Sequence, residues 1–124
     1  HNPEFTMIEL YQAYATFEDL MDMTEELICS LAMELKGSLV FEYGDETVDM
    51  SRPWKRINIT EGLEEKLGKE TVANNARLFQ KAASMGIDHK GIRGKAMVEM
   101  FEALYERNLI NPTFVYGFPL DVSP

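Results

Sequence analysis

The sequence has 124 residues, of which 45% are hydrophobic and 27% are charged, a composition typical of one small globular domain with a buried core. Its formal net charge of −9 argues against binding of nucleic acid through a general excess of lysine and arginine, because such binding depends on neutralising phosphates. The one cysteine, Cys29, cannot form a disulfide within the chain, and its helical, apolar surroundings predict a small buried side chain. No apolar run is long enough for a membrane-spanning helix. We expect a cytoplasmic protein with no membrane partner.

The first eleven residues predict a strand whose two faces differ in character. Because side chains alternate along a strand, one face carries Thr6, Ile8 and Leu10, and the other carries Phe5, Met7, Glu9 and Tyr11. The second face joins an aromatic ring to a carboxylate and a phenol, and a carboxylate among apolar neighbours needs a cationic or hydrogen-bonding partner. This face suits a ligand with a planar part and a cationic part. The ordinary alternative for the carboxylate is a solvated strand position.

Apolar residues then recur at helical spacing from Phe17 to Leu35. Thr16 is a suitable N-cap, and Gly37 is a suitable residue to end the helix. The apolar positions are Phe17, Leu20, Met21, Met23, Leu27, Ile28, Leu31 and Leu35. We expect this apolar stripe to pack on the back of the sheet, against Ile8 and Leu10.

Two short β-type runs, residues 38–43 and 46–50, flank the pair Gly44-Asp45 and predict a hairpin. The next segment, residues 52–56, places a tryptophan among three basic residues, an arrangement that could stack on and neutralise nucleic acid. We favour an inward-packed Trp54 with solvated cations beside it, because a buried aromatic ring is the commoner occurrence.

Residues 60–109 are helical in pattern throughout, with Thr60 and Thr71 as candidate caps and Gly68 and Gly86 as candidate helix ends. The last helix of this region has an apolar face that predicts core packing, made by Met97, Met100, Phe101 and Leu104.

Three shorter features complete the pattern. Pro112 prevents the last helix from continuing, and residues 113–118 predict a second strand because they are rich in aromatic and β-branched side chains. The run GIRGK at 91–95 lacks the spacing of a phosphate-binding loop. We expect His89 at the surface and not as a metal ligand, because no cysteine or second histidine lies near it in the sequence.

The opening run HNPEFT, followed by Glu9-x-Tyr11, resembles the second half of motif 2 in class II lysyl-tRNA synthetases. The resemblance covers the whole chain, although the middle is only loosely similar, and the family usually has glutamine where Asn111 stands. The other similar runs are AYA at 13–15, DLM at 19–21, TEELI at 24–28, LINPTFV at 109–115 and FPLDVSP at 118–124.

The resemblance implies an α+β fold in which residues 1–124 form part of the antiparallel sheet of a class II synthetase, with packed helices and a helical insertion at residues 60–110. The arginines that complete the family's ATP site, and the acidic residues that hold Mg²⁺, would lie outside this sequence. We therefore expect a fragment of a catalytic domain that is inactive alone, with neither a catalytic nucleophile nor a metal ligand.

The resemblance also implies the site residues and the reaction. Phe5 would stack on the adenine of ATP beside His1 and Asn2, and Glu9 and Tyr11 would bind the lysine substrate. The whole enzyme would use ATP and Mg²⁺ to form lysyl-adenylate and would then transfer lysine to tRNA-Lys. Its tRNA would be held mainly by another domain, and the enzyme would be a homodimer.

Two alternatives remain open. The ligase that attaches lysine to elongation factor P shares HNPEFT and PTFVY, but it tends to have tryptophan where Leu10 stands and lacks the match at 24–28. The other alternative is a non-catalytic interaction module that binds a partner through an exposed sheet face, since open strand edges pair readily with other chains.

Overall fold

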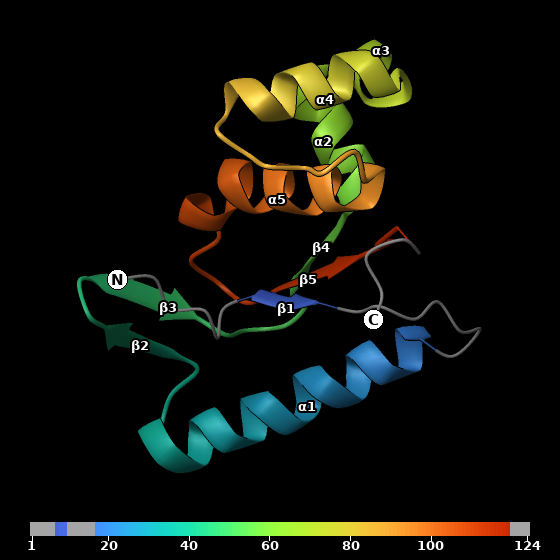
Figure 1. Ribbon diagram of the computed structural model, residues 1–124. Coiled ribbons are helices and arrows are strands. Elements are labelled where there is room, and N and C mark those ends of the chain that lie inside the picture. The colour runs from blue at the N-terminus through green and yellow to red at the C-terminus, as the bar shows by residue number, and fades with distance from the viewer. Residues whose placement is uncertain (1–6, 10–16, 120–124) are drawn as a thin grey trace.

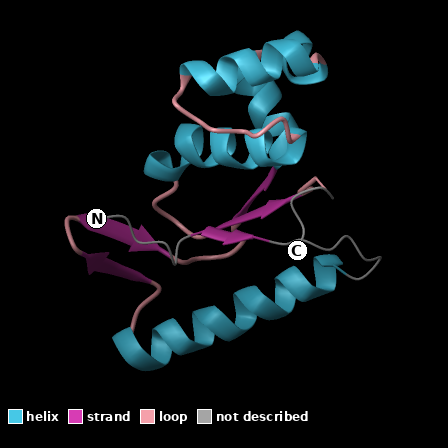
Figure 2. Ribbon diagram, viewed as in Figure 1, coloured by secondary structure: helices cyan, strands magenta, loops and turns pink. Residues whose placement is uncertain are grey.

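The structure is a computed structural model that describes residues 7–9 and 17–119 (Figure 1). A three-stranded sheet lies between one long helix and a unit of shorter helices, and a two-stranded hairpin extends from its side (Figure 2). Within the described part of the chain, no helix has the length and apolarity needed to cross a membrane. The elements in order are β1 (Met7–Glu9), α1 (Phe17–Lys36), β2 (Val40–Tyr43), β3 (Glu46–Asp49), β4 (Lys55–Asn58), α2 (Ile59–Leu67), α3 (Lys69–Ala73), α4 (Asn75–Ser84), α5 (Arg93–Tyr105), the 3-10 turn η2 (Glu106–Asn108) and β5 (Thr113–Tyr116).

The three-stranded sheet has the order β1-β5-β4, and β5 runs parallel to both of its neighbours. The expected antiparallel arrangement is therefore wrong for this sheet, and among the described strands only β2 and β3 pair in antiparallel fashion. The reason lies in the connections. All of the helices α2 to α5 intervene between β4 and β5, and a crossover of that length can return the chain to the end of the sheet where β4 began, so that β5 runs parallel to β4.

The predicted hairpin is confirmed, with strands slightly shorter than predicted. Tyr43 of β2 and Glu46 of β3 are register partners on either side of the two-residue loop. Gly44 takes a φ of +61°, which glycine adopts without the steric cost that a side chain would bring.

The predicted end of α1 is also confirmed. The helix finishes at Lys36, and Gly37 follows with a φ of +72° while its N–H donates to Met33 O at 2.9 Å. The expected N-cap, Thr16, lies outside the described residues.

The predicted packing face of α1 is wrong for most of its residues. The buried side of the helix carries Met21, Glu25 and Ala32. Most of the predicted stripe faces away from the sheet, with exposed fractions between 45% and 78% at Leu20, Met23, Leu27, Leu31 and Leu35. Spacing alone identified an apolar face, but the face that turns inward is the one on which Met21 and Ala32 join a buried apolar cluster and Glu25 meets its donors.

The helical region from α2 to α5 is confirmed except for residues 85–92, which form a non-helical connection, and the side-chain caps are asparagines and not threonines. Asn58 Oδ1 accepts from the N–H of Glu61 at 3.1 Å, and Asn74 Oδ1 accepts from that of Arg77 at 3.0 Å. A capping side chain must precede the first turn, whereas Thr60 and Thr71 lie inside α2 and α3. The two glycines predicted to end helices, Gly68 and Gly86, do follow α2 and α4 with positive φ.

The apolar face of α5 lies in the core, as predicted. Met97, Met100 and Phe101 are at most 3% exposed, while Leu104 is half-buried at the margin. Close packing here depends on Gly62 of α2, because a Cβ at this position would lie 2.9 Å from Phe101 Cε1. Next to this contact the Tyr105 hydroxyl donates to Gly62 O at 2.7 Å, which fixes α5 against α2.

Cys29 is half-buried, and its thiol donates to Met50 O at 3.1 Å. Burial is the main cause of a raised pKa for this thiol, and the nearby Glu25 carboxylate adds to the effect while Arg52 opposes it. Since the thiolate is the reactive form, we expect iodoacetamide to alkylate Cys29 at least about tenfold more slowly in the folded chain than in the urea-unfolded chain at neutral pH. Mass spectrometry of timed samples measures both rates, and equal rates would contradict this prediction.

Candidate functional site

The strand β1 includes Glu9, the one predicted site residue within the described part of the chain. β1 forms an edge of the three-stranded sheet, and Glu9 is the register partner of Val115 in β5. The other residues predicted to bind ATP or lysine lie outside the described residues, and they are His1, Asn2, Phe5 and Tyr11. The pairing shows that the opening segment and the segment around residue 115 lie side by side although they are far apart in the chain.

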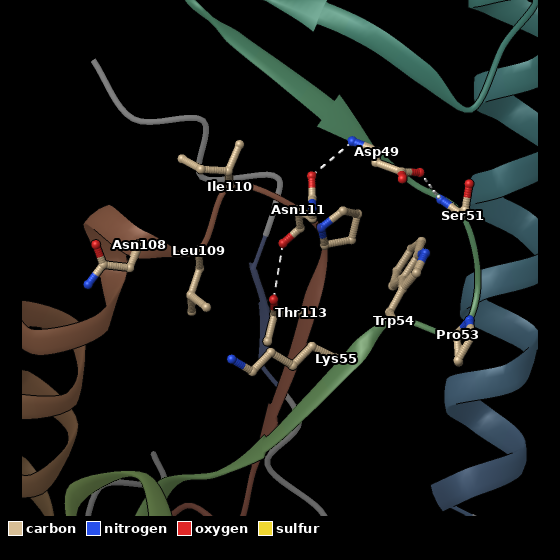
Figure 3. A pocket seen from close by; sticks show the side chains of 11 residues that line it. Asp49, Ser51, Pro53, Trp54, Lys55, Asn108, Leu109, Ile110, Asn111 and Thr113 are labelled. Carbon is tan, nitrogen blue, oxygen red and sulfur yellow. Dashed lines mark hydrogen bonds between the residues drawn. The ribbon is translucent and has the colours of Figure 1, made fainter. Parts of the chain in front are cut away.

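A pocket of about 440 Å³ opens where β4 and β5 begin (Figure 3). Lys55 and Thr113 are the first residues of these strands, and both line the pocket. Thr113 is also the register partner of Met7, so the pocket lies at the end of the sheet where β1 begins. The lining residues are Asp49, Ser51, Pro53, Trp54, Lys55, Asn108, Leu109, Ile110, Asn111, Pro112 and Thr113.

Hydrogen bonds fix the polar wall of this pocket. Asn111 Oδ1 accepts from the N–H of Asp49 at 2.8 Å, and the Thr113 hydroxyl donates to Asn111 O at 3.0 Å (Figure 3). Within the 49–55 segment, Asp49 Oδ1 accepts from the N–H of Ser51 at 2.9 Å. Hydrogen bonds from the side chain and backbone of Ser51 lower the pKa of Asp49, so its carboxylate is charged at neutral pH. The Asn111 amide thus joins the start of β5 to the end of β3.

The side chains that line the pocket could bind a polar ligand. The pocket offers a carboxylate, the ammonium of Lys55, two amides and two hydroxyls, with Trp54 as an apolar wall. None of its lining residues is a histidine or a cysteine, so neither hydroxyl has an imidazole within the pocket to act as its base. The sequence analysis missed this pocket because its walls come from the segments 49–55 and 108–113, which only the folded chain brings together.

The segment 52–56 is held by a buried carboxylate. Glu25 of α1 is 1% exposed, and its Oε2 accepts from the backbone N–H of Trp54 at 2.9 Å. Its Oε1 accepts from Arg52 Nε at 3.0 Å, and Arg56 Nη2 lies 3.7 Å from Oε2. One side chain of α1 therefore organises both the backbone and the cations of this segment.

The prediction that Trp54 packs inward is confirmed. Its ring is 4% exposed and tilts against Phe114 of β5 with centroids 5.4 Å apart, and its indole N–H donates to Met50 O at 2.8 Å. The neighbouring Arg52 and Arg56 are exposed, as expected, and both also pair with Glu25. A signal was present in the sequence, since Asp22 and Glu25 are one helical turn apart and can face two arginines together.

No acidic or nitrogen–sulfur cluster suited to a metal ion is found within residues 7–9 and 17–119. His89 is half-buried, its ring stacks on that of Phe79 with centroids 4.3 Å apart, and its Nδ1 accepts from the N–H of Gly91 at 2.9 Å. This imidazole therefore has a structural environment, which differs from the surface position that the sequence predicted.

Comparison with known proteins gives a consistent result along the whole chain. The family model of class II tRNA synthetases (D, K and N) matches residues 1–124. The lysine–tRNA ligase of Bacillus subtilis is 41% identical over 128 aligned positions, and that of Carboxydothermus hydrogenoformans is 43% identical. A lysine–tRNA ligase 2 of Methanosarcina mazei is 39% identical.

These matches cover all of this chain but only 25% to 26% of each relative, so the chain spans about a quarter of the length of the curated relatives it matches. The aligned quarter includes the strand β1, the buried Glu25 cluster and the pocket beside Asn111. On the family match over residues 1–124 and on these identities, the chain belongs to the class II tRNA synthetases of the D, K and N group.

Proposed function

We propose that the full-length protein is a cytoplasmic, homodimeric lysine–tRNA ligase. The observation that carries this proposal is the match of the entire chain, at about 40% identity, to proteins named lysine–tRNA ligase. In this reaction the lysine carboxylate attacks the α-phosphate of ATP, giving lysyl-adenylate and pyrophosphate. The lysyl group then passes to the terminal ribose of tRNA-Lys. Both steps need alignment and charge neutralisation more than a protein nucleophile.

Selection of lysine is assigned to Glu9 and Tyr11. A carboxylate and a phenol oxygen can both accept hydrogen bonds from an ammonium group, and the charged pair is the stronger of the two. A competing amino acid without the side-chain ammonium would leave the carboxylate unpaired, and this loss is the basis of discrimination. The sheet supports this assignment, because pairing with β5 fixes the backbone of Glu9.

Binding of ATP is assigned to His1, Asn2 and Phe5, the last through stacking on adenine. The bound Mg²⁺ would neutralise charge on the phosphates of ATP. We assign its ligands to acidic residues of the full-length protein that lie outside this sequence, as the family resemblance implies. We also infer that the helices within residues 60–110 form an insertion in the catalytic domain.

The test is a comparison of the full-length protein with the 124-residue chain. We expect lysine-dependent exchange of pyrophosphate with ATP, and charging of tRNA-Lys, by the full-length protein only. The other proteinogenic amino acids serve as controls for the exchange assay. Exchange that depends on a different amino acid, or lysine-dependent exchange by the 124-residue chain, would contradict the proposal.

The nearest alternative is the ligase that attaches lysine to elongation factor P. Both enzymes form lysyl-adenylate, so the exchange assay does not separate them. A second assay offers the full-length protein radioactive lysine with either tRNA-Lys or purified elongation factor P. Label on the tRNA alone supports the proposed function, and label on the factor alone favours the alternative.

One observation favours an interaction role for the chain when it is isolated. The exposed face of α1 presents Leu20, Met23, Leu27, Leu31 and Leu35, and large contiguous apolar surfaces are typical of association sites. We expect the 124-residue chain to associate with a second copy through this face. Size-exclusion chromatography at several concentrations tests this, together with titration of lysine and ATP. Association without ligand binding favours the interaction role for the isolated chain.

A further inference from the structure

Positive charge is concentrated in one part of this acidic chain. Residues 69–95 hold six of the twelve Lys and Arg but only two of the 21 Asp and Glu, so this segment has a net charge of +4. The rest of the chain holds six basic and 19 acidic residues, a net charge of −13. The charge of −9 for the whole chain therefore conceals a basic region, and charge distribution matters more for steering a ligand than the total does.

The basic segment folds as the outer end of the helical unit. It comprises α3, α4 and the connection into α5, and α3 and α4 lie beyond α5 on the side away from the sheet (Figure 1). Two contacts hold the connection against α4. Arg93 Nη1 donates to Asn75 Oδ1 at 2.8 Å, and Phe79 stacks on His89. The cations gathered in this unit are Lys69, Arg77, Lys81, Lys90, Arg93 and Lys95.

A groove of about 360 Å³ opens on α3 and α4. The residues that line it are Thr71, Arg77, Gln80, Lys81 and Ser84, and none of them is acidic. Arg77 and Lys81 are one helical turn apart, so they project from the same face of α4. The two cations, the Thr71 hydroxyl and the Gln80 amide are donors of the kind that proteins use to contact phosphate oxygens, while the Ser84 hydroxyl donates to Lys81 O at 2.6 Å. We call these five residues the basic groove.

The cations of the basic groove are available to a ligand. Arg77 is 59% exposed, and its partner Glu70, 3.3 Å away, is 87% exposed. An ion pair that is this open to solvent contributes little stability, so the guanidinium can exchange it for a phosphate. Lys81 is exposed as well. In contrast, Lys95 pairs with Glu99 and donates to Asp88 O, which gives it a structural role.

The surface around the basic groove favours a polyanion as its partner. Of the exposed large apolar side chains in the described residues, only Ile92 lies between residues 69 and 95. A helix that binds a membrane surface needs an apolar face, and the energetic centres of protein interfaces are rich in buried aromatic side chains. Binding through phosphates needs neither, because it depends on cations and counterion release.

We propose that the basic groove binds the sugar–phosphate backbone of the tRNA substrate. This inference rests on the proposed function, which supplies an RNA as the second substrate. The contact is independent of base sequence and adds to the binding that other parts of the full-length protein provide. It also places α3 and α4 next to bound tRNA, whereas β1 lies on the far side of α5 (Figure 1).

The experiment uses the full-length protein and the double variant Arg77→Gln/Lys81→Gln. Filter binding with tRNA-Lys transcript at several salt concentrations gives Kd and its salt dependence. Losing two phosphate contacts should raise Kd about tenfold at low salt and reduce the slope of log K against log salt by about 1.5. KM for tRNA should rise by a similar factor, while lysine-dependent ATP–pyrophosphate exchange stays unchanged because that reaction needs no tRNA.

The matched control is Lys36→Gln/Arg107→Gln, which removes the same charge from exposed positions outside the basic segment. If the two double variants change Kd and salt slope equally, or if neither changes them, the inference is overturned. If the basic-groove variant loses binding to phosphatidylserine vesicles but keeps its affinity for tRNA, the partner is a membrane and the inference is also overturned. Absence of lysine-dependent exchange in the unmodified protein would instead contradict the proposed function.

Discussion

Replacement of Glu9 by glutamine in the full-length protein is expected to lower kcat/KM for lysine by roughly 10²- to 10³-fold, because the ammonium of the substrate loses its charged partner. The substitution keeps the size of the side chain and one acceptor oxygen, so the loss reports the charge and not the volume. In free energy this corresponds to about 3–4 kcal/mol of transition-state stabilisation. ATP–pyrophosphate exchange at varied lysine concentration measures it.

Two controls make this result specific to lysine recognition. KM for ATP should change little, since the residues assigned to ATP are others. Glu18→Gln, a substitution of an exposed carboxylate on α1, should leave all constants unchanged. If Glu9→Gln changes kcat/KM for lysine less than threefold, the assignment of Glu9 is wrong. Tyr11→Phe should lower kcat/KM for lysine by a smaller factor than Glu9→Gln does, because it removes only a neutral hydrogen bond.

Replacement of Glu25 by alanine is expected to lower the free energy of unfolding of the 124-residue chain by about 3 kcal/mol, because it leaves a buried donor without its acceptor. The backbone N–H of Trp54 loses its bond to Oε2, and Arg52 loses its closest carboxylate. Arg52 itself is 41% exposed and regains water, so most of the effect comes from the buried N–H and the vacated volume.

Urea unfolding followed by tryptophan fluorescence measures this effect directly, since Trp54 is the single tryptophan and lies at the affected site. Glu25→Gln should lower the free energy of unfolding by about half as much as Glu25→Ala, because the amide oxygen can still accept from the Trp54 N–H. Glu26→Ala removes an exposed carboxylate from the next position of the same helix and should change stability by less than about 0.5 kcal/mol. Equal effects of Glu25→Ala and Glu26→Ala would contradict the role of the buried carboxylate.

Elements with a strong local signal were predicted correctly. Helix α1 ends before Gly37, the hairpin turns at Gly44, and the apolar face of α5 lies in the core. Each depends on interactions within a few residues, such as the left-handed conformation open to glycine or the spacing of side chains on one helix. The family resemblance rested in the same way on contiguous runs of sequence, and the comparisons confirm it.

From the sequence, the candidate site could be predicted only as five residues of the opening strand. Of these five, only Glu9 lies within the described residues. The pocket beside Asn111 escaped prediction because its two walls are about 60 residues apart in the chain, and hydrogen bonds such as that from the Asp49 N–H to Asn111 Oδ1 form only on folding. The basic groove was not predicted for a related reason, since the total charge of the chain does not reveal where the cations lie in the fold.

Local sequence therefore decided where helices and turns begin and end, and which family the chain resembles, because backbone conformation and short motifs depend on neighbouring residues. Tertiary structure decided the parallel direction of β5, the face that α1 turns inward and the pairing of Glu25 with two arginines. These features depend on which distant groups meet. A buried carboxylate is stable only beside its donors, and the helix orients to satisfy it even though leucines on its other face remain exposed.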